Sequence, residues 1–396
     1  GGATTISNVG NTVVLDDASN NFAAIGVTGS VVTLVDTNAI DLATTTATGA
    51  LSVTAGGAIT QSAAIAGSST SSYTTTADDS DITLTHADNA LVGAITLVST
   101  DTNSDNTEIV QLTNNTAGGT ILAGSTNTGT LTVVSTLGAI TQTGALNVGS
   151  TSSFTTSEDN AAITLDTNTN ALTGNVTISS QGTTGNVTID NGTTALGVQG
   201  TANGNLVLIS GEVITDTAAL TVSGTTTVTT DVANKTITLG TLASTGNVSL
   251  NSSGTTGNAV VNNTTTALGL ATSTIGGTLT AETDNSITVN GTVTSAGTTS
   301  VSASDDVVFA AAGALASGNG NITVTADDDN TPAATGGAIT MANGSTINSG
   351  TGTITLSADE DVSLGGLTTT NATANAVAIT SDSGSITDGG DTNTDI

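Results

Sequence analysis

The fold of this chain is decided by a stretch that occurs twice, as TGNVTISSQGTTGNVTIDNGTTALG at 173–197 and as TGNVSLNSSGTTGNAVVNNTTTALG at 245–269. Within each copy Val, Ile and Leu alternate with Thr, Ser or Asn, which is typical of a strand with one buried face. The Gly and Asn residues between these runs tolerate the left-handed backbone of tight turns. The stretch therefore predicts short strands joined by turns, and its recurrence predicts a stack of similar units.

A second marker extends this repeat along the chain. GAITQ occurs at 57–61 and again at 138–142, and the same shift in residue number carries Tyr73 onto Phe154. The central isoleucine of the marker recurs as Ile59, Ile140, Ile214, Ile287 and Ile386. The chain is thus built on a repeat of about 72–81 positions, with one longer interval at the end. We expect residues 1–396 to form one continuous, repeat-built β-solenoid.

Composition selects among the folds that contain many short strands. Aromatic residues make up 1% of the chain, and there is one Pro and no Cys. An array of β-sandwiches needs a separate core in every ~100 residues, normally with aromatic side chains. A parallel β-helix needs no large side chain, because small aliphatic residues fill its narrow interior and Thr and Asn cover its outside. We therefore predict an all-β parallel β-helix with roughly 20 residues per coil, on the order of 20 coils and no substantial helix.

Several consecutive runs resemble a known family. They are NNFAAIGVTGSVVTLVDTNAIDL at 20–42, GALSVTAGGAITQSAAI at 49–65, Tyr73, DITL at 81–84 and NALVGAITL at 89–97. In this order they are similar to the repeats of the filamentous-haemagglutinin-like, or β-strand-repeat, giant bacterial surface adhesins. The resemblance implies a right-handed parallel β-helix, export across the outer membrane and service as a stalk or filament. It implies no catalytic residues.

The chain offers few side chains for catalysis. His86 is the only imidazole and Lys235 the only cation, and there is no Arg. A Ser-His-Asp triad would have to use His86, which we interpret as a solvated residue near a turn, because its repeat counterpart is Thr167. Without Arg, an anionic substrate has no bidentate clamp. We expect no catalytic and no cofactor-binding residues.

The main enzymatic alternative is a polysaccharide lyase or glycosidase, which would use paired carboxylates as acid and base. The candidate pairs are Asp305 with Asp306 and Asp359 with Asp361. Sugar sites commonly present aromatic side chains as well, and only four aromatic residues exist. Two of them, Tyr73 and Phe154, are repeat equivalents, which indicates a core position rather than a unique site. We therefore expect a non-enzymatic protein.

Calcium is the ligand that the acidic residues suit best, although no motif fixes its site. Carboxylates gather at three predicted turns: Asp78, Asp79 and Asp81; Asp327, Asp328 and Asp329; and Asp359, Glu360 and Asp361. Hard oxygen ligands of this kind suit Ca²⁺. Neither an EF-hand loop nor the calcium-binding nonapeptide repeat is present. Solvated surface charge is the alternative interpretation, and no residue is assigned as a metal ligand.

Charge and hydropathy restrict the partners. The formal net charge is −31, so binding to a nucleic-acid backbone, which needs Lys and Arg, is not expected. No stretch approaches the ~18 apolar residues of a membrane-spanning helix. GSITDGG at 384–390 takes the place of a marker that is followed by more strands in other copies. We therefore expect the partners to be further solenoid segments or identical chains placed end to end.

Two functions remain open. The first is a structural segment of an extracellular adhesin or filament at the bacterial cell surface, which contacts other cells or surfaces. The second is a surface- or carbohydrate-binding solenoid module that uses exposed Thr and Asn arrays. A regular outward file of Thr in register over many coils would favour the second function. The uneven repeat lengths favour the first.

Overall fold

The computed structural model describes residues 2–100, 105–127, 129–327, 337–389 and 396. In these ranges the ordered elements are β-strands, and none is a helix, which confirms the predicted all-β class. The strands are parallel and stack as a β-solenoid of about 18 turns, close to the expected number. Two compact units are distinguished, residues 1–204 and 205–396, and each is described by itself. The continuity of one solenoid over 1–396 stays a prediction.

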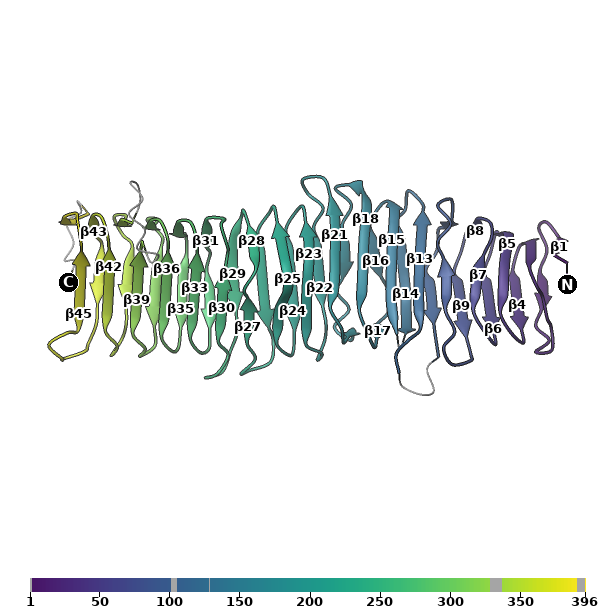
Figure 1. The fold of residues 1–396 in the computed structure, drawn as a ribbon, viewed down its shortest axis with the longest axis horizontal. Coiled ribbons are helices and arrows are strands. Elements are labelled where there is room, and N and C mark those ends of the chain that lie inside the picture. The colour runs from purple at the N-terminus through teal and green to yellow at the C-terminus, as the bar shows by residue number, and fades with distance from the viewer. Residues whose placement is uncertain (1, 101–104, 128, 328–336, 390–395) are drawn as a thin grey trace. The chain divides into compact units, whose positions relative to one another are not determined.

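The first unit consists of two parallel sheets that the chain visits in alternation (Figure 1). Its sheet A contains β1 (Thr4–Ser7), β3 (Ile25–Gly29), β5 (Ile40–Ala47), β7 (Ile59–Gln61), β8 (Ile65–Gly67), β10 (Ile82–Leu84), β11 (Ala90–Leu91), β13 (Ile109–Asn115), β15 (Thr130–Leu137), β18 (Ser152–Asp159), β21 (Val176–Gln181) and β23 (Leu196–Ala202). Its sheet B contains β2 (Val13–Leu15), β4 (Val32–Asp36), β6 (Leu51–Ala55), β9 (Ser71–Thr75), β12 (Ile95–Val98), β14 (Thr120–Asn127), β16 (Ile140–Gln142), β17 (Leu146–Val148), β19 (Ile163–Leu165), β20 (Ala171–Leu172) and β22 (Val187–Asp190).

The second unit is built in the same way. Its sheet A contains β25 (Ile214–Val222), β27 (Ile237–Leu239), β28 (Leu242–Ser244), β30 (Ala259–Asn262), β33 (Leu279–Thr283), β36 (Thr299–Ala303), β39 (Ile322–Ala326), β42 (Ile354–Ala358) and β45 (Val377–Ser381). Its sheet B contains β24 (Leu206–Ser210), β26 (Thr226–Thr230), β29 (Asn247–Asn251), β31 (Leu268–Leu270), β32 (Ser273–Ile275), β34 (Ile287–Val289), β35 (Thr292–Ser295), β37 (Val307–Phe309), β38 (Ala314–Ser317), β40 (Ile339–Met341), β41 (Thr346–Asn348), β43 (Val362–Leu364), β44 (Gly366–Thr368) and β46 (Ile386–Asp388).

The period-two pattern of the sequence places one residue type inside and another outside. In β4 and β6 the paired residues Val32 and Leu51, and then Leu34 and Val53, are all buried. The Thr and Ser residues between them face outward and stay partly exposed. Burying a Val or Leu side chain contributes about 1.5–3 kcal/mol. Because each strand packs on the strand one turn before and one turn after it, stability is additive along the stack.

The number of residues in one turn varies along the stack. Ile25 pairs with Leu42 in a short turn, whereas Ile322 pairs with Ile354 across a much longer stretch of chain. Both pairs still bring a buried aliphatic residue onto another. Inward residues therefore stay paired although the turns differ in length, and some strand pairs take up an additional residue as a register shift, as β3 with β5 and β12 with β14 do.

The few aromatic residues include three of the largest buried side chains, those of Tyr73, Phe154 and Phe309. Tyr73 in β9 and Phe154 in β18 are both 0% exposed, which confirms that their shared repeat position is a core position. Burial raises the pKa of the Tyr73 phenol, and the Ser71 hydroxyl lies close enough to offset part of this rise without forming a well-aligned hydrogen bond. The Tyr73 hydroxyl is buried without a hydrogen-bond partner among the described residues.

The repeat is not a whole number of turns. GAITQ at 57–61 supplies β7 in sheet A, but its copy at 138–142 supplies β16 in sheet B of the same unit. Between the two copies the chain changes sheet seven times, so one repeat makes three and a half turns. The second unit behaves alike. Ile214 begins β25 in sheet A and Ile287 begins β34 in sheet B, again after seven changes.

Candidate functional site

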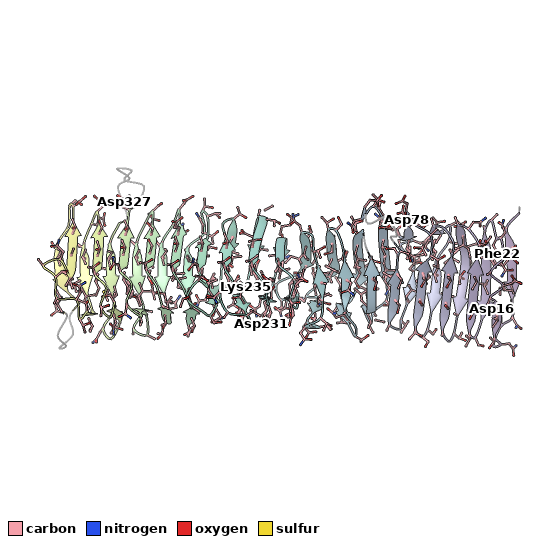
Figure 2. All side chains as sticks on the ribbon, turned by 90° about the horizontal axis from the view of Figure 1, so that it is seen from below. Asp16, Phe22, Asp78, Asp231, Lys235 and Asp327 are labelled. Carbon is pink, nitrogen blue, oxygen red and sulfur yellow. The ribbon has the colours of Figure 1, made fainter. Side chains whose placement is uncertain are left out.

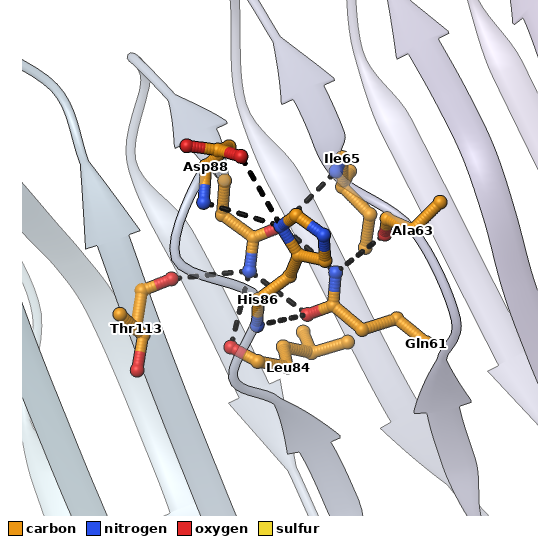
Figure 3. Close-up of polar contacts among 8 residues, drawn as sticks. Gln61, Ala63, Ile65, Leu84, His86, Asp88 and Thr113 are labelled. Atoms are coloured by element: carbon orange, nitrogen blue, oxygen red, sulfur yellow. Dashed lines mark hydrogen bonds and ion pairs between the residues drawn. The ribbon is translucent and has the colours of Figure 1, made fainter.

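A hydrogen-bonded pair of side-chain amides lies inside a corner of sheet A in the first unit (Figure 3). Gln61 Nε2 donates to Asn89 Oδ1 at 2.8 Å, and Asn89 Nδ2 donates to Gln61 Oε1 at 2.8 Å. Asn89 is 0% exposed. Its Oδ1 also accepts from the backbone N–H of Ile65 at 3.0 Å, and its Nδ2 donates to the carbonyls of Leu84 and Thr113, each at 3.1 Å. The amide thus replaces backbone partners where the strands are interrupted.

The same pair recurs one repeat later on the other sheet. Gln142 Nε2 donates to Asn170 Oδ1 at 2.9 Å, and Asn170 Nδ2 donates to Gln142 Oε1 at 3.0 Å. Asn170 Oδ1 also accepts from the backbone N–H of Leu146 at 2.9 Å. These three residues are the repeat equivalents of Gln61, Asn89 and Ile65, so the repeat carries an internal hydrogen-bond network with it. The chemistry of this network is structural, because it orders a corner.

Other buried asparagines form hydrogen bonds with both the backbone N–H and the carbonyl of a single residue in the neighbouring turn. Asn114 Oδ1 accepts from the backbone N–H of Leu91 at 2.9 Å, and its Nδ2 donates to the carbonyl of Leu91 at 3.0 Å. Asn191 does the same to Leu172, and Asn263 to Ser244. Each side-chain amide therefore pairs with a peptide group as another strand residue would. Such bonds satisfy buried backbone groups that would otherwise cost free energy.

At other corners the residue directly before a strand is Asp or Asn, and its side chain forms a hydrogen bond to the next turn. The Oδ1 atom accepts a hydrogen bond from the backbone N–H of the equivalent residue one turn further on. This bond joins Asp81 to Ile109, Asn205 to Thr225, Asn258 to Thr278, Asp306 to Ala338, Asn321 to Thr353 and Asp361 to Ser385, at 2.7–3.0 Å. Asp306 and Asp361, each a member of a candidate acid–base pair, therefore have a corner-holding contact. In the sequence, the residues that make this contact appear as Asp or Asn immediately before a strand.

His86 lies at the corner that contains the first amide pair (Figure 3). Its Nδ1 accepts from the backbone N–H of Asp88 at 3.2 Å and lies 4.0 Å from a carboxylate oxygen of that residue. The backbone N–H of His86 donates to Gln61 Oε1 at 3.3 Å. The His86 side chain is 37% exposed and that of Asp88 is 78% exposed. These contacts place His86 at the surface beside a turn, as predicted.

Lys235, which is labelled in Figure 2, forms an ion pair between successive turns. Its Nζ lies 2.6 Å from both carboxylate oxygens of Glu212. Both side chains are partly exposed. A pair of this kind at the surface contributes only about 0–1 kcal/mol. Lys235 directly follows the turn at 233–234, and the sequence did not reveal its carboxylate partner.

The first acidic cluster differs in one member from the predicted set. Carboxylate oxygens of Asp78, Asp79 and Glu108 lie within 4.8 Å of one another. Asp79 is exposed and has a positive φ of 52°, whereas Glu108 is buried. Asp81 is instead engaged in its corner bond. Glu108 was not predicted because it lies one turn further along the chain. It directly precedes Ile109, whose backbone N–H donates to Asp81. Three carboxylate donors are chemically suited to a hard cation.

The other acidic groups meet at one corner of the second unit. Asp327, Asp359 and Asp382 line a polar cavity of about 390 Å³, together with hydroxyl-bearing side chains of neighbouring strands. Asp328 and Asp329 lie outside the described residues. Glu360, predicted with Asp359 and Asp361, follows the same strand, and its backbone N–H donates to the carbonyl of Gly337. The cavity is rimmed by carboxylates, so its charge favours cations over anions.

Outward hydroxyl groups form rows, here called files, that run across neighbouring strands of sheet A in the second unit. One file contains Thr280, Ser300, Thr323 and Thr355, and a second contains Ser302, Thr325, Ser357 and Thr380. Each residue is paired in register with the next member of its file. The files stay aligned across the long turn between Ile322 and Ile354. A grid of hydroxyl groups therefore exists on part of this sheet.

Comparisons with known proteins identify the repeat and nothing more specific. A family model described as repeats of unknown function (DUF5649) matches residues 28–98, 107–179 and 184–251, together more than half of the chain. No curated protein matches the sequence significantly. No solved structure matches it either. Within the described ranges, no helix has the length and apolar character needed to cross a membrane.

Proposed function

We propose that this chain, which belongs to the family of repeats of unknown function (DUF5649), is a non-catalytic structural segment, a stalk or fibre, of an extracellular bacterial surface adhesin or filament. Its partners in this role are further solenoid segments or identical chains placed end to end. The observation that carries the proposal is the content of the repeat. What recurs from one copy to the next is a core position, Tyr73 and Phe154, and a corner-ordering amide pair.

Stacking energetics support the same role. Each turn contacts the turn before it and the turn after it, and the buried residues of both sheets are mostly Val, Ile, Leu and Ala. Such a stack can be lengthened by adding repeats, because each added turn brings its own interface. The net charge of −31 with one cation keeps chains apart in solution. A protein that separates two objects needs these properties and no particular binding site.

The test is electron microscopy of the native protein on the cells that make it, with antibody to this segment. The proposal expects the label on surface appendages, between the cell envelope and their outer ends. Label confined to the cell interior would contradict the extracellular assignment. Hydrolysis of a polysaccharide by the purified chain, lost on changing a single carboxylate, would contradict the non-catalytic assignment.

The hydroxyl files favour a second candidate, a surface- or carbohydrate-binding module. The members of one file, such as Ser300, Thr323 and Thr355, follow strands that neighbour each other at about 4.8 Å. A regular neutral grid of this kind fits a repeating hydroxylated surface. Replacing Thr323 by Val keeps the shape and removes a hydroxyl. If insoluble polysaccharide retains the parent chain and releases this variant, the second candidate holds; equal or no retention of both favours the stalk.

A further inference from the structure

Two buried polar side chains lie next to each other on neighbouring turns of the first unit. Ser99 directly follows β12, and Asn127 ends β14. Val98 pairs with Thr126, and the backbone N–H of Ser99 donates to the carbonyl of Thr126 at 3.0 Å, so Ser99 and Asn127 are the next pair in register. Ser99 is 2% exposed and Asn127 is 1% exposed. Within the described ranges, the Ser99 hydroxyl and both polar atoms of the Asn127 amide have no hydrogen-bond partner.

A register shift within β14 explains why Asn127 is buried. Leu122 pairs with Ile95, but Gly124 pairs with the very next residue of β12, so β14 contains one additional residue. Gly124 has a positive φ of 129°, which glycine adopts at no steric cost. A bulge of this kind changes the direction of the side chains that follow it. Ser125 and Asn127 are therefore buried, although strict alternation from Leu122 would place them outside, and the Ser125 hydroxyl also has no partner in the part of the chain that the structure describes.

The equivalent corner one repeat later is closed by protein atoms. Ser180 is the repeat equivalent of Ser99 and is also buried. Its hydroxyl donates to the carbonyl of Gly185 at 2.6 Å and accepts from the backbone N–H of Asn203 at 3.0 Å. The next residue in register with it is Ala202, whose side chain has no polar atom. The first corner therefore contains more buried polar atoms than its equivalent and gives them fewer protein partners.

These polar atoms need partners from outside the protein. A buried hydroxyl or amide loses the hydrogen bonds that it makes to water in the unfolded chain, and this loss costs free energy unless another partner replaces them. The Asn127 amide can donate twice and accept twice, and the Ser99 hydroxyl can donate once. The two side chains do not bond to each other. Buried polar groups in this situation are generally satisfied by an internal water molecule, which takes about 2–4 polar partners.

We propose that this corner is a water-binding site, in which a buried water molecule bridges the Ser99 hydroxyl and the Asn127 amide. Water is the ligand that fits, because both side chains are neutral and together they offer donors and acceptors. Asn127 is also among the residues that line a cavity of about 250 Å³ at the ends of β14, β17 and β20, which brings solvent to this corner. The water takes the place of the protein contacts that Ser180 makes in the other copy. The site does not depend on the proposed structural function.

The first experiment is a crystal structure of the full chain at a resolution that shows ordered water. We expect a water oxygen about 2.5–3.2 Å from both Ser99 Oγ and a polar atom of the Asn127 amide. The Asn127→Leu variant should lose this water. The matched control Asn168→Leu, which makes the same change at an exposed turn position, should keep it. A corner without water in the parent chain, or side chains of Ser99 and Asn127 that bond only to protein atoms, would overturn the proposal.

The second experiment needs no crystal and uses the sign of a stability change. Ser99→Ala removes a hydroxyl that binds water, so the midpoint of denaturant unfolding should not rise above that of the parent chain. If this hydroxyl were buried without water, its removal would relieve a cost and raise the midpoint, which would overturn the proposal. The matched control is Ser180→Ala, which removes two hydrogen bonds to protein atoms and should lower the midpoint more than Ser99→Ala does.

Discussion

Replacing Asn89 by Ala tests the corner chemistry on which the stack depends. The substitution removes five hydrogen bonds of the Asn89 side chain, two of which join it to Gln61. Two of the groups left behind, the N–H of Ile65 and the carbonyl of Leu84, belong to residues that are 0% exposed. Water therefore does not replace the lost partner at either group without opening the corner.

The magnitude follows from those two groups. A buried backbone group without a partner costs about 1–3 kcal/mol, so the variant should lose about 2–6 kcal/mol locally. Taking about 3 kcal/mol, the equilibrium for opening the corner rises about 100-fold, because each 1.4 kcal/mol is a factor of ten. The loss is local, since turns stabilise mainly their neighbours.

The assay is hydrogen–deuterium exchange at the amide of Ile65, followed in peptides that contain β8. We expect its exchange to quicken about 100-fold in the Asn89→Ala variant, with distant strands unchanged. Asn170→Ala should have an effect of the same size at Leu146, because the network is duplicated. The control is Asn168→Ala at an exposed turn position, which should change stability by less than about 0.5 kcal/mol. Unaltered exchange at Ile65 would refute the role assigned to the amide pair.

Three further outcomes are expected. Tyr73→Phe should raise thermal stability by about 1 kcal/mol, because it removes a buried hydroxyl that has no partner among the described residues, and Phe154→Tyr should lower it; a less stable Tyr73→Phe variant would contradict this. His86→Ala should change the free energy of unfolding by less than about 0.5 kcal/mol and should leave binding unchanged, because the contacts of His86 are at the surface. A larger loss of stability in denaturant unfolding would show that His86 has a structural role that these contacts do not explain. Calcium should raise the melting temperature and the light scattering above those in chelator at equal ionic strength, because it offsets the net charge of −31; identical curves would mean that the acidic corners are only solvated.

Most of the fold could be predicted from alternation and repetition. GAITQ, DITL and their relatives form strands, and Tyr73 and Phe154 share a buried position as their spacing indicated. The half-turn could not be predicted in this way. The spacing of two copies fixes the length of the repeat, whereas the number of turns depends on corner lengths. Those lengths vary, as the pairs Ile25–Leu42 and Ile322–Ile354 show, and strand patterns do not report them.

The polar contacts were harder to predict because they join successive turns. Asn89 reaches Gln61 from the next turn, and Glu108 reaches Asp78 and Asp79 in the same way. One signal was present in the sequence: NAL at 89–91 recurs as NAL at 170–172, with the same shift as the GAITQ marker. It did not stand out, because both Asn residues lie in turn-like runs where Asn is expected for its backbone alone. Only the structure shows that these two are buried.

The central claim, that the segment is a stack of interchangeable turns, is tested most directly by deleting one turn. Removing 279–298 takes out one whole turn and joins Thr278 to Thr299, so that Ala259 of β30 meets Thr299 instead of Leu279. Register and alternation are kept at this junction. The comparison is Val301→Asp, which changes one residue and places a charge at a position that is 0% exposed.

The measurement is resistance of the second unit to protease, with circular dichroism as the check on strand content. We predict that the chain lacking a whole turn stays as resistant as the parent, while Val301→Asp opens strands around β36 and is cut there. Loss of a complete turn should therefore do less harm than the change of a single side chain. If the deletion is digested as fast as Val301→Asp, the turns are not interchangeable and the account is wrong.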